Sequence, residues 1–179
     1  MKLTRPDRVT QFNRTLLLLL PAATAAAVAQ GVSSFQTQFD LTLGGDANEV
    51  LVALLPTADG GMLLAGNSNS DVSGTKETGC WGDYDIWLVR LDGQGRKLWE
   101  QVYGGDGADT VQVVIPRKEG GYLVGGVSES GVTGTKTTER FGGKDYWLLE
   151  TDDDGNVVRE NAYGTRGDEI GRASCRERV

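Results

Sequence analysis

The chain has no histidine and is poor in cysteine, methionine and proline. Its 179 residues include two Cys, two Met and four Pro. Without histidine the commonest general base and transition-metal ligand are missing, which excludes a Ser-His-Asp or Cys-His catalytic arrangement within this sequence. We therefore predict no catalytic residues and no cofactor. Cys80 lacks a base partner and is expected to be an inert thiol. Because Cys175 lies in a segment interpreted below as an artefact, stability is expected to come from packing and not from a disulfide.

Basic residues are outnumbered, with 18 Lys and Arg against 25 Asp and Glu and a formal net charge of −7. An acidic protein is repelled by nucleic-acid phosphates and by anionic membrane surfaces. We therefore predict no nucleic-acid partner. The remaining partner classes are a protein or a polysaccharide ligand.

Residues 1–29 have the three parts of a secretory signal peptide in order. A basic leader precedes the apolar run "TLLLLLPAATAAAVA", and the small-x-small sequence ending at Ala29 precedes Gln30. Pro21 interrupts the run and its second half is alanine-rich, which argues against a membrane anchor. We predict cleavage between Ala29 and Gln30, a secreted or cell-surface location, and no membrane insertion after cleavage.

The last residues, 169–179, read "EIGRASCRERV" and break the pattern of the preceding chain. A back-translation of this segment reads through the common adaptor of short-read DNA sequencing. We interpret residues 169–179 as a sequencing-adaptor artefact, and we expect the chain to be a fragment of a longer protein.

Between these segments the sequence repeats itself with a period of 60 residues and no gap. A regular internal repeat of this length indicates an array of similar structural units. The pairs include Gly44-Gly45-Asp46 with Gly104-Gly105-Asp106, Pro56 with Pro116, and Asp85-x-Trp87-Leu88 with Asp145-x-Trp147-Leu148.

Each period contains four short runs rich in β-branched and aromatic residues, separated by turn residues. A long polar loop lies between the second and third runs, and no window outside the leader has a helical period. The expected class is all-β. The expected strands are 49–56, 61–68, 85–92 and 97–104 in the first copy, and 109–116, 122–129, 145–152 and 157–164 in the second.

Four-stranded antiparallel repeats of this length are typical of β-propeller blades, whereas solenoid coils are usually shorter. We predict two complete blades, at 46–105 and 106–165, with a truncated third beginning at 166–168. Residues 30–45 match the end of a repeat, since Leu43 lies 60 positions before Tyr103. They are predicted to be an N-terminal closing strand that completes the last blade of a longer propeller.

The combination of "GGD", "DGG" followed by "ML", "SGTK" and "DIWLVRLDGQG" resembles secreted β-propeller-like repeat proteins, which are often exported as type IX secretion cargo. The resemblance covers residues 35–168 and implies a secreted repeat protein without specifying its activity. The segment "WLVRLDGQGRKLWE" is also similar, more weakly, to a blade of quinoprotein-type propellers.

Two groups of residues are weak candidates for binding. Asp152, Asp154 and Asn156 place carboxylate and amide oxygens on a tight turn, as calcium prefers, but the first copy lacks most of them, and a solvated hairpin turn is the favoured interpretation. We therefore predict no metal site. Trp81 and Phe141 recur on the long polar loop, where an aromatic ring could meet a glycan or hold the loop down.

Two classes of function remain. The favoured hypothesis is a non-catalytic secreted or cell-surface β-propeller scaffold or binding module, because the two copies are so alike and neither carries a distinctive chemical group. The alternative is a fragment of a propeller enzyme, quinoprotein-like or polysaccharide-degrading, whose catalytic blades are missing.

Overall fold

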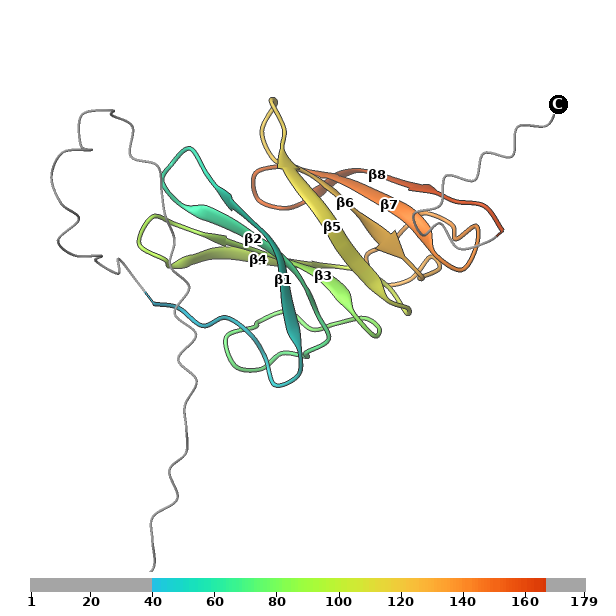
Figure 1. Cartoon of the computed structure of the whole chain (residues 1–179), viewed down its shortest axis with the longest axis horizontal. Helices are drawn as coiled ribbons and strands as arrows, with labels where there is room; N and C mark the ends of the chain where they lie inside the picture. The colour runs from blue at the N-terminus through green and yellow to red at the C-terminus, as the bar shows by residue number, and fades with distance from the viewer. Residues whose placement is uncertain (1–39, 167–179) are drawn as a thin grey trace, which may run out of the picture. The chain divides into compact units, whose positions relative to one another are not determined.

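The computed structural model describes residues 40–166, in which it forms eight strands and no helix. The strands make two separate antiparallel sheets, each with its four strands in sequence order (Figure 1). The first sheet contains β1 (Glu49–Pro56), β2 (Met62–Ser68), β3 (Asp85–Leu91) and β4 (Lys97–Tyr103). The second contains β5 (Asp109–Pro116), β6 (Tyr122–Ser128), β7 (Asp145–Thr151) and β8 (Val157–Tyr163). The all-β class and the assignment of one antiparallel sheet to each period are confirmed.

The two sheets repeat even their irregularities. The register shifts between Leu51 and Ala53 in β1, and between Val111 and Val113 in β5. Beside the second shift lies Gly126, where an added Cβ would overlap backbone atoms of β5. Gly126 therefore allows the close approach of the β5 backbone.

The core lies between the sheets, where one face of the first packs on one face of the second. Its aromatic members include Tyr103, Tyr122 and Trp147, and Trp99 packs against it with its ring edge-on to Tyr122, at a centroid separation of 6.4 Å. Trp87 and Trp147 are both buried, so both are packing residues. Burial of each large apolar side chain contributes about 1.5–3 kcal/mol, so this interface is the main attraction between the repeats.

Hydrogen bonds also cross between the sheets. The Tyr103 hydroxyl donates to the carbonyl of Gly155 at 2.5 Å, and the backbone N–H of Val111 donates to Asn67 Oδ1 at 2.8 Å. The indole N–H of Trp99 donates to the carbonyl of Asp153 at 3.1 Å. These directional contacts set the position of one repeat against the next.

Several predicted segments lie wholly or partly outside the described residues. These are the signal peptide 1–29 with its Ala29–Gln30 cleavage site, residues 30–39 of the closing strand, and residues 167–179. The described part of the closing strand, residues 40–45, is not a strand, and no described strand pairs with it. Within residues 40–166 no helix is long and apolar enough to cross a membrane.

Candidate functional site

The long loop between β2 and β3 is held to the sheet by a buried lysine. Lys76 donates from Nζ to the carbonyl of Ser70 at 2.8 Å and to the carbonyl of Thr78, and it lies 5.9 Å from the ring centroid of Trp87. Burial lowers the pKa of Lys76. Lys136 occupies the same position in the second repeat, is equally buried, and donates to the carbonyl of Thr138 at 2.6 Å. Both lysines therefore hold their loops in place.

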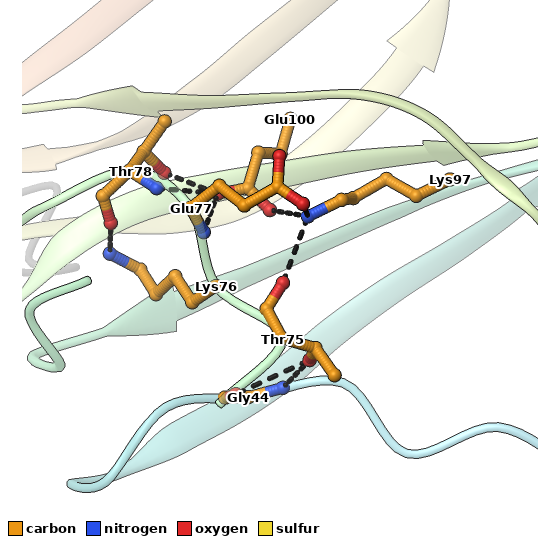
Figure 2. A network of polar contacts seen from close by, with 7 residues as sticks. All are labelled: Gly44, Thr75, Lys76, Glu77, Thr78, Lys97 and Glu100. Atoms are coloured by element: carbon orange, nitrogen blue, oxygen red, sulfur yellow. Dashed lines mark hydrogen bonds and ion pairs between the residues drawn. The ribbon is translucent and has the colours of Figure 1, made fainter. Parts of the chain in front are cut away.

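A glutamate on the last strand of each sheet braces the same loop from the other side. Glu100 Oε1 accepts from the backbone N–H groups of Glu77 and Thr78 and from the Thr78 hydroxyl, each at 2.7 Å, while Lys97 contacts Oε2 at 2.8 Å (Figure 2). Burial alone would raise the pKa of Glu100, but these hydrogen bonds, first the one from Lys97, hold it below its ordinary value. The carboxylate is thus fully used in loop bracing.

Glu160 plays this part in the second repeat. It accepts from the backbone and hydroxyl groups of Thr137 and Thr138 and, at 2.8 Å, from the indole N–H of Trp147. In the first repeat the corresponding indole N–H, on Trp87, is buried without a hydrogen-bond partner in the described structure. Glu100 and Glu160 therefore hold their loops in the same way, but Glu160 accepts from an indole N–H, whereas Glu100 pairs with Lys97, whose counterpart in the second repeat is Val157.

Two buried aspartates meet where the first repeat passes into the second. Asp85, at the start of β3, and Asp109, at the start of β5, are both 0% exposed. Asp85 Oδ2 accepts from the backbone N–H of Trp81, and Asp109 Oδ2 accepts from that of Gly105 at 2.8 Å. The Oδ1 atoms of both have no hydrogen-bond partner in the described structure. Burial, with a smaller contribution from the charge of Asp109, raises the pKa of Asp85 to about 6.

This junction explains the repeated "GGD" sequence. A Cβ on Gly104 would overlap the Asp85 carboxylate, and a Cβ on Gly105 would overlap the side chain of Thr133. Because glycine has no Cβ, the backbone at Gly104 and Gly105 can pass close to the Asp85 carboxylate and to the loop that carries Thr133. The aspartates were not among the predicted site residues, although a charged residue repeated at the head of an apolar strand was visible in the sequence.

A groove of about 750 Å³ opens between the two sheets, beside the turns that join β1 to β2 and β5 to β6. Trp99 and Tyr122 line it together with the exposed side chain of Leu98. Arg90 and Arg117 add positive charge, and Arg90 pairs through Nη2 with both carboxylate oxygens of Asp59 at 2.6 Å. An aromatic and aliphatic surface with a charged rim suits a ligand that has both apolar faces and hydroxyl or amide groups.

Two of the three candidate metal ligands, Asp152 and Asn156, bond to each other within their own turn, and Asp154 takes part through its backbone N–H. Asp152 Oδ1 accepts from the backbone N–H groups of Asp154 at 3.0 Å and Asn156 at 2.8 Å, and the Asn156 amide donates to Oδ2 at 3.0 Å. The side-chain bond from Asn156 is the largest cause of the lowered pKa of Asp152. Within residues 40–166 no three acidic, cysteine or histidine side chains are grouped to hold a metal ion. These contacts are those of a hairpin turn.

Trp81 and Phe141 are each more than half exposed and lie outside the groove. A Cβ added to Gly134 would lie 2.8 Å from Trp81 Cγ, so the Trp81 ring rests against the long loop of the following repeat. Cys80, the residue before Trp81, has its Sγ 3.7 Å from the carbonyl oxygen of Asn69, and burial raises the pKa of its thiol. A raised pKa disfavours the reactive thiolate form.

The fold and the groove define the class of this protein: an all-β repeat protein in which two four-stranded antiparallel sheets pack face to face. No protein-family model matches the sequence, and a search of curated proteins finds no match.

Proposed function

We propose that the chain is a non-catalytic scaffold or binding module of a secreted or cell-surface protein, and that each sheet is one blade of a β-propeller. One observation carries the proposal. The charged groups best suited to chemistry are buried or half-buried, each hydrogen-bonds a loop, and they recur at the same places in both repeats: Lys76, Asp85 and Glu100 with Lys136, Asp145 and Glu160. An enzyme places different residues on different repeats, whereas a scaffold repeats the same ones.

The alternative, a fragment of a propeller enzyme, has one observation in its favour. A carboxyl group whose pKa is raised to about 6 beside a second carboxylate is typical of acid–base catalysis. However, Asp85 and Asp109 are both fully buried, and neither lines the groove. A substrate in the groove would not reach them, so we place the scaffold function first.

The groove between the sheets is the proposed ligand site, and a polysaccharide is the proposed ligand. Trp99 and Leu98 supply apolar surface on which a sugar ring could rest, while Arg117 and Asp153 supply polar groups at the rim. Leu98 has a matched counterpart, because Val158 stands 60 positions later and is equally exposed but does not line the groove.

The test is a sedimentation assay of the full chain with insoluble cellulose, chitin and xylan. Leu98→Ser removes apolar contact worth about 1 kcal/mol, so affinity should fall about fivefold. Val158→Ser, the matched control, should bind as the wild type does. Equal binding by both variants would remove the groove from the proposal. Release of reducing ends from soluble forms of these polymers would contradict a non-catalytic role.

A further inference from the structure

The side of the second sheet that faces away from the first carries exposed apolar residues where the first sheet has core. Ile86 is 1% exposed and Tyr103 3%, but their counterparts Tyr146 and Tyr163 are 47% and 54% exposed. We call this surface the open face; its exposed apolar members are Val113, Ile115, Tyr146 and Tyr163. The residues that correspond to Val113 and Ile115 in the first sheet pack against the core. The open face is therefore largely apolar, with one exposed ion pair, between Arg159 and Glu150, where the first sheet has Trp99 and Arg90.

The opposite side of the pair of sheets carries the complementary surface. In the second sheet, the face that packs on the first sheet consists of Val111, Val114, Tyr122, Val124, Trp147 and Leu149. In the first sheet, the positions 60 residues earlier form what we call the leading face: Leu51, Leu54, Met62, Leu64, Trp87 and Val89. Every position is apolar in both sets. Leu51 is half exposed whereas its counterpart Val111 is fully buried, but Met62, Trp87 and Val89 are already buried within the single chain, so the accessible part of the leading face is centred on Leu51.

We propose that a second copy of this chain docks its leading face on the open face, so that copies associate head to tail. The contact would continue the established interface between the two sheets, with each residue replaced by its counterpart. This inference is independent of any ligand in the groove, and goes beyond the proposed function. Because the two surfaces differ, the contact is heterologous, and repeated contacts lead to a ring or an open chain of copies.

The hydrogen bonds between the two sheets of one chain can be compared with those that the same positions would make between two copies. Tyr163 keeps the hydroxyl with which Tyr103 reaches the carbonyl of Gly155, and the corresponding acceptor is the carbonyl of Gly95. Gly95 and Gly155 also share their backbone conformation, with φ of 78° and 80°. Two bonds are lost: Val127 takes the place of Asn67, whose side chain accepts from Val111, and Arg159 takes the place of Trp99, whose indole N–H donates to the carbonyl of Asp153. The contact between copies is therefore weaker than the internal one and depends on concentration.

Sedimentation of the full chain in an analytical ultracentrifuge, over a range of concentrations, tests the proposal. We expect the mass of the wild type to rise with concentration. Tyr146→Lys, on the open face, and Leu51→Lys, on the leading face, should each remain monomeric. Val132→Lys alters an equally exposed residue on the loop between β6 and β7 and should associate as the wild type does. An equimolar mixture of the two monomeric variants should form a one-to-one complex, because each retains the surface that the other has lost.

Three results would overturn the proposal: a wild type that stays monomeric, a Leu51→Lys variant that still associates with itself, or a mixture of the two variants that forms no complex. The second result would mean that open faces pair with one another. The sheet content of each variant is checked by circular dichroism, and Ile115→Lys replaces Tyr146→Lys if the latter does not fold.

Discussion

Replacement of Asp85 by asparagine tests whether the buried carboxyl at the junction of the repeats destabilises the folded protein at neutral pH. Asp85 Oδ1 is buried without a partner, and its pKa is raised from 3.8 to about 6, mainly by burial. An asparagine has nearly the same shape and keeps an oxygen that can accept from the backbone N–H of Trp81. Its amide nitrogen adds a donor in place of a buried negative charge.

The sign and size of the effect follow from the pKa. Between pH 3.8 and about 6 the unfolded chain releases the Asp85 proton while the folded protein retains it, so this group makes the protein less stable as pH rises through that window. A shift of roughly 2 units corresponds to about 3 kcal/mol, reached in full above the folded-state pKa. The Asp85→Asn variant has no carboxyl group to ionise at this position. Its free energy of unfolding at neutral pH should therefore exceed that of the wild type by up to about 3 kcal/mol.

Urea unfolding followed by tryptophan fluorescence, at intervals from about pH 4 to about pH 7, measures the difference between variant and wild type. Only the difference is informative, because Asp59 and Glu100 have lowered pKa values and add a slope of the opposite sign. Asp145→Asn separates the effect of burial from that of the Asp109 charge, since Asp145 is also 0% exposed with an Oδ1 that has no partner in the described residues, but no carboxylate of a following repeat lies beside it there. A difference that does not change with pH, or a variant less stable than the wild type at neutral pH, would refute the reasoning.

Two further predictions concern loop bracing and backbone geometry. Lys76→Ala leaves two buried carbonyls without their donor and should cost about 2 kcal/mol in urea unfolding, whereas Lys118→Ala, on an exposed turn, should change stability by less than about 0.5 kcal/mol. Gly121→Ala adds a Cβ that overlaps the carbonyl of Thr151 at a φ of 73°, and it should cost more than about 2 kcal/mol. Gly131→Ala points into open space and should lie within about 0.5 kcal/mol of the wild type by the same assay. Equal effects within either pair would contradict these assignments.

The strand boundaries were predictable because each strand is decided locally. The first strand of each period was expected at 49–56 and 109–116, and β1 and β5 have those bounds. Pro56 and Pro116 end the strands, and the turns that follow contain glycines, so the chain itself marks where pairing stops. The repeat supported the strand assignment, because the same strand boundaries had to fit both copies of the sequence.

The junction and the groove were not predictable in the same way. Asp85 and Asp109 come from different sheets, and the sequence does not show that both lose contact with water. In the sequence, nothing distinguishes Trp99 from other aromatic residues on strands. It lines the groove because the end of β5 and the turn that joins β5 to β6 form the opposite wall. The predicted closing strand shows a related limit, since residues 40–45 match a strand in sequence but have no partner strand in the described structure.

The sequence by itself determined the all-β class, the 60-residue period and the order of strands within each sheet, because β-strands and turns depend on residues close together in the chain. Only the tertiary structure decided which face of each sheet is buried, which carboxylates lose their solvent, and where a ligand groove opens. Those properties arise between residues as far apart as Tyr103 and Gly155, which come into contact only when one sheet packs on the next.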